Sequence, residues 1–182
     1  MPDLHQPCSG KSLTIIGLGN ELLSDDGAGI RVVRELKKQL GADAITFHEL
    51  SVGGLQLLDY IVGHERCIIV DALVTGTHPP GTMLRFIQTA DSEPVRLSSS
   101  HQVDLTQVVS LAQLFGAQIP RTLVVYGIEA GDITTFRDGC TEEVSRAIPK
   151  LVEAICSDVA EESLARGTPA GAWQLIPAVV PE

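Results

Sequence analysis

The chain lacks several features that would assign it to common classes of protein. Its four cysteines, Cys8, Cys67, Cys140 and Cys156, form no C-x-x-C pair, so neither a zinc ribbon nor a redox motif is indicated. No apolar run approaches the length of a membrane span, and no apolar segment led by Lys or Arg stands near residue 1. We therefore expect a reduced, cytoplasmic protein that does not associate with a membrane.

Positive charge is also scarce. The 182 residues carry 13 Lys and Arg against 23 Asp and Glu, for a net charge of −10. This balance argues against a nucleic-acid backbone or an anionic membrane surface as the partner. An acidic surface suits a basic segment of another protein, or simply solubility.

The composition is that of a globular protein, with 44% hydrophobic and 20% charged residues. The length suits one compact domain with a sizeable core. We expect a flexible leader over residues 1–11, a single α/β domain over residues 12–157, and a mobile tail over residues 158–182. The tail is predicted to be mobile because it is rich in Ala, Pro and Gly.

The most informative stretch is a strand, a turn and a helix near the start of the chain. Residues 13–16 form a short apolar run typical of a buried strand, and Gly17 and Gly19 mark a sharp turn after it. A helical pattern follows Asp25 and Asp26 at once. A dinucleotide-binding G-x-G-x-x-G motif is not complete, because Leu22 stands where its third Gly belongs. The helix has one apolar face, formed by Ile30, Val33, Leu36 and Leu40.

The remaining pattern alternates strands with helices. Strands are predicted at 44–50, 67–72 and 122–126, with 82–88 as an antiparallel edge, because each is a short apolar or alternating run. Amphipathic helices are predicted between them, with apolar faces that include Leu55, Phe115 and Val144. Strands and helices in this order indicate an α/β protein with a mostly parallel sheet.

Three titratable groups are placed to meet at one rim of such a sheet. Asp25 or Asp26 follows the first strand, Asp71 ends the third, and His101 opens a helix after a long polar link. Ligands bind at the carboxyl edge of open α/β sheets. Two carboxylates and a neutral imidazole suit a divalent ion such as nickel or zinc, or a general-base pair. Alternatively, the Asp side chains are helix and turn caps and His101 faces water. Spacing alone does not choose between Asp25 and Asp26.

A series of motifs resembles the hydrogenase maturation proteases, the endopeptidases that trim the C-terminus of the [NiFe]-hydrogenase large subunit. The first is the run GLGNELLSDDGAG at residues 17–29. The likeness spans residues 13–155, and its landmarks occur in the family's order. They are Gly53-Gly-Leu, Ile69-Val-Asp-Ala72, Pro80-Gly-Thr-Met83, Ser100-His-Gln102, Gly127-Ile-Glu and the final helix.

The resemblance implies a three-layer α/β/α fold with a five-stranded, mostly parallel twisted sheet of the phosphorylase/hydrolase-like kind. It implies a metal-binding and catalytic trio on Asp26, Asp71 and His101. It also implies a substrate, the large-subunit precursor, whose own nickel (or another divalent ion in its place) completes the site before the C-terminal extension is removed. We expect a monomer. The family often has an Asp where this chain has Glu49, so Glu49 is not assigned as a ligand.

Two other functions fit parts of the pattern. One is a peptidyl-tRNA hydrolase-like esterase, since those enzymes also begin with a strand and a Gly-x-x-Asn turn. They place a catalytic His soon after that turn, where this chain has Asp25 and Asp26, and the negative net charge disfavours tRNA. The other is a scaffold or metal-delivery protein that binds the hydrogenase precursor without cutting it.

Overall fold

The protein is built on one twisted sheet. The computed structural model describes residues 13–51, 54–89, 112, 114–160 and 173–176. Within them six strands lie in the order β2-β1-β3-β5-β4-β6. The first four in that order are parallel: β2 (Ile45–Leu50), β1 (Leu13–Leu18), β3 (Arg66–Leu73) and β5 (Thr122–Glu129). On the other side of β5, β4 (Met83–Thr89) pairs antiparallel with it and with β6 (Trp173–Leu175).

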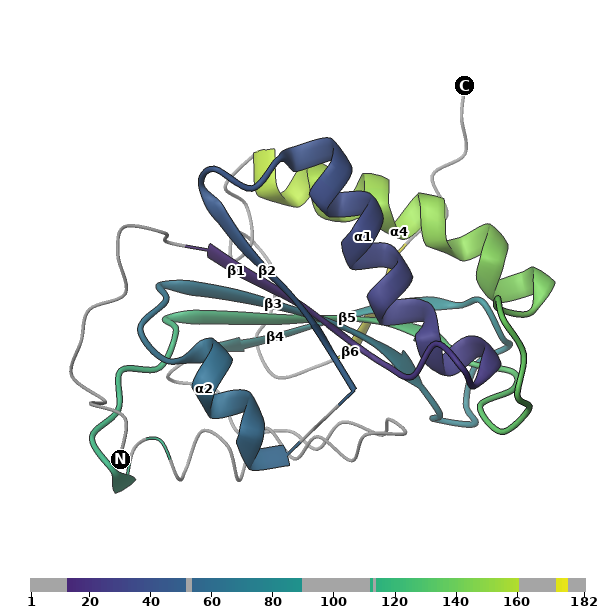
Figure 1. The fold of residues 1–182 in the computed structure, drawn as a ribbon, viewed down its shortest axis with the longest axis horizontal. Coiled ribbons are helices and arrows are strands. Elements are labelled where there is room, and N and C mark those ends of the chain that lie inside the picture. The colour runs from purple at the N-terminus through teal and green to yellow at the C-terminus, as the bar shows by residue number, and fades with distance from the viewer. Residues whose placement is uncertain (1–12, 52–53, 90–111, 113, 161–172, 177–182) are drawn as a thin grey trace.

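Helices cover both faces of the sheet (Figure 1). Helices α1 (Ala28–Leu40) and α4 (Glu142–Ala160) lie together on one face. The short turn η2 (Gly54–Leu57) and helix α2 (Leu58–Ile61) lie on the other. The three-layer α/β/α arrangement with a mostly parallel sheet is therefore confirmed. No helix in the described part of the chain combines the length and the apolar character that a bilayer crossing needs.

The central strands are buried on both faces, which is why they appear in the sequence as continuous apolar runs. Along β1, Ile15 packs into the core under α1 and α4, and the next residue, Ile16, packs into the core on the α2 face. The parallel register pairs Gly17 with Val70 and Asp71 with Gly127. The carboxyl ends of β1, β3 and β5 therefore meet at one edge of the sheet.

The sheet has one strand more than the five that were expected. Strand β6 comes from the tail that we placed outside the domain, and Ile176 after it packs against the core under α1 and α4. Helix α4 also continues to Ala160, beyond the boundary at residue 157. A strand of three residues is too short to produce a periodic pattern, and its pairing with β4 is decided by tertiary contacts. The predicted leader, residues 1–11, lies outside the described residues.

Two residues assigned to apolar helix faces are exposed instead. Leu55 is in η2, whose 3₁₀ geometry has about three residues per turn, so the spacing of an α-helix does not hold there. Phe115 stands in a turn just before Gly116, and its side chain is also exposed. Most of the helix predicted to begin at His101 lies outside the described residues. Within it, Ala112 is buried as predicted.

Gly29 allows helix α1 to sit directly on the sheet. A Cβ atom at this position would lie 2.3 Å from the carbonyl oxygens of both Leu18 and Val70, at the ends of β1 and β3. Backbone atoms cannot move aside as the end of a flexible side chain can. The first turn of α1 is therefore held against the carboxyl edge by a contact that only Gly permits.

We predict that Gly29→Ala destabilises the protein by roughly 3 kcal/mol or more, because the added methyl group overlaps two main-chain oxygens. Helix propensity alone would predict a gain of about 1 kcal/mol. Urea unfolding followed by circular dichroism measures the difference. Gly116→Ala is the control: its Cβ would meet open space, and only its φ of 65° opposes the change, at a cost of about 1 kcal/mol. Equal losses in the two variants would contradict the packing argument.

Candidate functional site

Buried carboxyl groups gather at the carboxyl edge of the sheet. Among the described residues, the buried acidic side chains are Asp25, Asp26, Asp71 and Glu129. Asp25 and Asp26 lie in η1 (Ser24–Gly27), the turn that leads from β1 into α1. Asp71 lies near the end of β3, and Glu129 is the last residue of β5. Burying several acidic groups in one place is costly unless partners compensate their charges, so the contacts of each group define its role.

Asp25 joins η1 to the loop between β5 and α4. Its Oδ2 accepts hydrogen bonds from the backbone N–H groups of Gly131 and Asp132, at 2.8 and 2.9 Å, and from the Thr141 hydroxyl at 3.0 Å. Its Oδ1 accepts the Thr141 N–H at 2.6 Å. The Asp25 N–H also donates to the Asp132 carbonyl, at 3.0 Å. Both carboxylate oxygens therefore serve the fold.

Asp26 faces the turn after β1. Its Oδ2 accepts the backbone N–H of Asn20 at 2.9 Å. The Asp26 carbonyl lies so close to Gly19 that a Cβ on that glycine would be 2.2 Å from its oxygen. The Asn20 side chain in turn accepts the Leu22 N–H at 3.1 Å. This compact turn holds Asp26 beside the end of β1, and the turn η1 contacts strand β3.

Asp71 is fully buried near the end of β3, next to β1 in the sheet. Its Oδ1 accepts the N–H of the following residue, Ala72, at 2.8 Å. Asp71 lies in β3 and Asp26 in the turn that follows the neighbouring strand β1, so both are at the same edge of the sheet. His101, the third member of the predicted trio, lies outside the described residues. Within the described part of the chain, no three His, Cys, Asp or Glu side chains gather closely enough to hold a metal ion.

Glu129 is a buried group that lies beyond the end of the strand predicted at 122–126. Its Oε1 accepts the N–H groups of Thr75 and Gly76, at 2.9 and 2.8 Å, and its Oε2 accepts the Thr75 hydroxyl at 2.8 Å. Glu129 therefore holds the loop that follows Asp71. The signal that could have revealed it is the one used for Asp71, an acidic residue at the end of an apolar strand.

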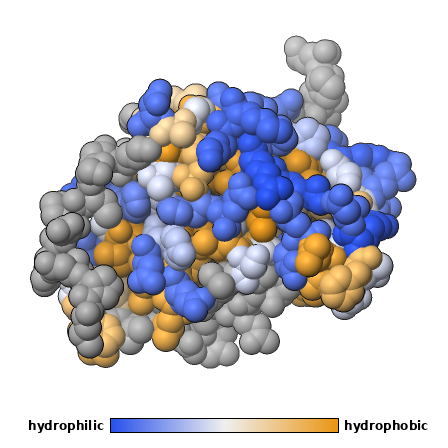
Figure 2. Space-filling view, viewed as in Figure 1, coloured by the Kyte–Doolittle hydropathy of each residue, from blue (hydrophilic) through white to orange (hydrophobic). Residues whose placement is uncertain are grey.

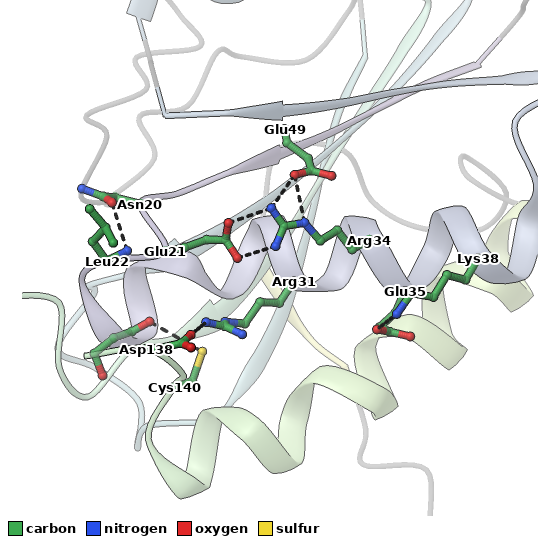
Figure 3. A network of polar contacts seen from close by, with 11 residues as sticks. Asn20, Glu21, Leu22, Arg31, Arg34, Glu35, Lys38, Glu49, Asp138 and Cys140 are labelled. Atoms are coloured by element: carbon green, nitrogen blue, oxygen red, sulfur yellow. Dashed lines mark hydrogen bonds and ion pairs between the residues drawn. The ribbon is translucent and has the colours of Figure 1, made fainter. Parts of the chain in front are cut away.

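Glu49, which was not assigned as a ligand, is paired with Arg34. The Arg34 guanidinium lies between two carboxylates (Figure 3): Glu49 at 2.8 Å and Glu21 at 2.5 Å. The hydrogen bond to Glu49, and then that to Glu21, raise the pKa of Arg34. The pairs are half-exposed and contribute little to stability. They link β2, the turn after β1 and helix α1 on the outside of the molecule.

Ser24 is enclosed by the same β5–α4 loop that binds Asp25. It is buried, and its φ of 49° is in the left-handed region that side chains rarely adopt. Arg137 donates to its hydroxyl at 3.2 Å, and the Cys140 thiol lies 3.7 Å from its carbonyl oxygen. Burial, and then the charge of Asp25, raise the pKa of the Cys140 thiol to about 11. Cys140 is therefore protonated at neutral pH and is a poor candidate for a nucleophile.

The four buried carboxylates differ in what they contact. Asp25 and Glu129 each bind a loop through both of their oxygens. Asp26, in the turn after β1, and Asp71, in the neighbouring strand β3, lie at the edge where α/β proteins bind their ligands. Two carboxylates in that position can bind a divalent cation or accept a proton from water.

Comparisons with known proteins agree with this architecture. A family model described as hydrogenase maturation protease matches residues 30–158. The hydrogenase 2 maturation protease of Escherichia coli is 27% identical over 84% of this chain and 93% of its own length. The hydrogenase expression/formation protein HoxM of Cupriavidus necator is 30% identical over 76% of this chain and 69% of its own.

Solved structures show the same fold. The hydrogenase maturating endopeptidase HybD from Escherichia coli superposes with a TM-score of 0.69 at 25% identity, over 82% of this chain and 93% of that one. The [NiFe] hydrogenase maturation protease HybD from Thermococcus kodakarensis gives 0.59 at 26% identity, over 81% and 98%. The proteins that match this chain in sequence and share its α/β fold are proteases and endopeptidases, which defines its class. The chain belongs to the hydrogenase maturation protease family.

We predict that Asp25→Asn lowers the free energy of unfolding by roughly 2–4 kcal/mol, because an amide NH₂ must then face a backbone donor in a buried site. Glu49→Gln is the comparison. Its ion pair with Arg34 is half-exposed, so we expect a loss of about 1 kcal/mol or less. Chemical denaturation of both variants tests the difference. An Asp25→Asn variant as stable as the wild type would show that the anchoring role of Asp25 is wrong.

Proposed function

We propose that this chain is a monomeric, cytoplasmic endopeptidase that removes the C-terminal extension of a [NiFe]-hydrogenase large-subunit precursor after nickel insertion. Asp26, Asp71 and His101 recognise the nickel carried by the substrate. The observation that carries the proposal is the burial of Asp26, after β1, and of Asp71, in the neighbouring strand β3, in a chain of the hydrogenase maturation protease family. The family match also favours the protease over the scaffold and the tRNA esterase.

Burial explains why the substrate's nickel matters. Asp26 is 3% exposed and Asp71 is 0% exposed, so both carboxylates lie in surroundings of low dielectric. There a carboxylate attracts a cation more strongly than it does in water. A divalent ion on the peptide is therefore held more tightly than an uncharged segment would be, and carboxylate and imidazole ligands suit nickel. The site then selects precursors that already contain their metal.

The residues of this chain have separate tasks in the proposed reaction. Asp26, Asp71 and His101 hold the nickel-bearing segment at the edge of the sheet, and a metal held there can polarise the scissile carbonyl or activate water. Asp25 and Glu129 hold the two loops beside this edge. The acidic pair is thereby kept in place before the substrate arrives, which is how preorganised sites lower the cost of binding.

The direct test is to incubate the protein with nickel-loaded and nickel-free large-subunit precursor and to record intact masses. We expect a shortened product only from the nickel-loaded form. Cleavage of both forms would support the endopeptidase function but contradict the proposal that the protein senses nickel. Binding of the precursor without cleavage of either form would contradict the endopeptidase function and support the scaffold function.

We predict that Asp71→Asn and His101→Ala each slow processing of the nickel-loaded precursor by about 100-fold or more. Mutation of a group that only orients a metal ligand already lowers metal affinity or activity by about 10–100-fold. Asp71 and His101 are proposed to be ligands themselves, so we expect the larger loss. Initial rates from gel densitometry measure the loss, and thermal unfolding checks that each variant is folded. Asp59→Asn is the control, because Asp59 is an exposed residue of α2. A normal rate in either variant would remove that residue from the proposed site.

A further inference from the structure

Large apolar side chains are exposed at the edge that carries Asp26 and Asp71. Leu22 follows β1, Val74 follows β3 and Phe136 lies in the loop after β5. Leu114 and Phe115 are also exposed, but they precede β5 and belong to the part of the chain that leads to its amino end. Figure 2 shows apolar surface at the end of the molecule where β1 turns into α1 and β5 leads toward α4. A single exposed apolar residue needs no explanation, whereas several around one edge indicate a contact surface.

Leu22 and Phe136 are held on a rigid backbone. The N–H of Arg137, next to Phe136, donates to the Leu22 carbonyl at 3.1 Å, and the Ser24 N–H donates back to the Arg137 carbonyl at 3.3 Å. Leu22 stands beside Asn20 at the start of α1 (Figure 3), where the Asn20 side chain accepts its N–H. Their side chains are nevertheless 65% and 81% exposed.

The loop that carries Phe136 is also built in advance. Asp132 Oδ1 accepts the N–H groups of Thr134 and Thr135, at 3.0 and 3.1 Å. At its base the loop is bonded to the Asp25 carboxylate through Gly131 and Asp132. The segment therefore presents an aromatic ring to solvent from a fixed position. Apolar groups that are already ordered bind a partner at a lower entropic cost than mobile ones.

The two side chains adjoin the proposed reactive site. Leu22 is four residues before Asp26, and the parallel bridge between Leu23 and Arg137 brings the Phe136 loop to the same turn. The Asn20 N–H, two residues before Leu22, donates to the Asp26 carboxylate, so a polypeptide bound at Asp26 lies next to this turn. We propose that Leu22 and Phe136 form an apolar clamp that grips a hydrophobic side chain of the large-subunit precursor beside the scissile bond. This inference rests on the proposed function.

The test compares two pairs of the same residue types. Leu22→Ser/Phe136→Ser removes the proposed clamp, and Leu114→Ser/Phe115→Ser removes equally exposed apolar groups elsewhere. With nickel-loaded precursor as the substrate, we expect the first variant to raise KM by roughly 10-fold or more with a smaller change in kcat. Buried apolar anchors at interfaces commonly contribute that much. We expect the second variant to match the wild type. Thermal unfolding confirms that both variants are folded, and Leu22→Met/Phe136→Leu should recover most of the affinity.

The outcomes separate the clamp from the proteolysis. An unchanged KM in the Leu22→Ser/Phe136→Ser variant, with normal processing by the wild type, would overturn the clamp and leave the endopeptidase intact. An equal loss in both variants would also overturn it, because the effect would then follow general apolar exposure. If the wild type does not process the precursor, calorimetric titration with the same precursor decides the matter. Weaker binding by the first variant alone would support the clamp, and equal binding would overturn it.

Discussion

The Asp25 carboxylate is the constraint on which the site depends. Its two oxygens accept hydrogen bonds from Gly131, Asp132 and Thr141, so the turn after β1 cannot move independently of the loop between β5 and α4. A buried carboxylate with several donors is stable as a unit and costly to disturb, because removing the acceptor leaves the donors unsatisfied. Asp26 is the next residue of the same turn, and the loop that carries Phe136 begins at Gly131 and Asp132, so this junction supports both.

Close packing and buried charge act together at the carboxyl edge. Gly29 lets α1 touch the ends of β1 and β3, which moves η1 in against the sheet. That approach leaves Asp26 and Asp71 almost without solvent. In the proposed function, this burial gives the site its selectivity: the carboxylates favour a substrate that brings its own cation. A more open edge would hydrate both groups and weaken the preference.

Much of the fold and part of the site were predictable from residue order. Short apolar runs that end in Asp or Glu mark central parallel strands, and the placement of Asp71 at the edge follows directly from that pattern. Spacing alone did not distinguish Asp25 from Asp26, because two adjacent carboxylates in one turn have the same sequence context. They differ in their tertiary contacts: Asp25 binds the loop between β5 and α4, and Asp26 binds the turn after β1. Leu55 was misassigned because a 3₁₀ turn changes the helical phase, and β6 was missed because three residues make no pattern.

The sequence by itself determined the α/β class, the mostly parallel sheet and the edge at which its polar residues collect, since these follow from the local alternation of apolar and polar residues. Only the tertiary structure decided what each acidic group does. Asp25 and Glu129 bind segments more than 50 positions away in the chain, and their roles depend on loop contacts that no local pattern encodes. The exposure of Leu22 and Phe136 is of the same kind, because burial is a property of the whole packed molecule.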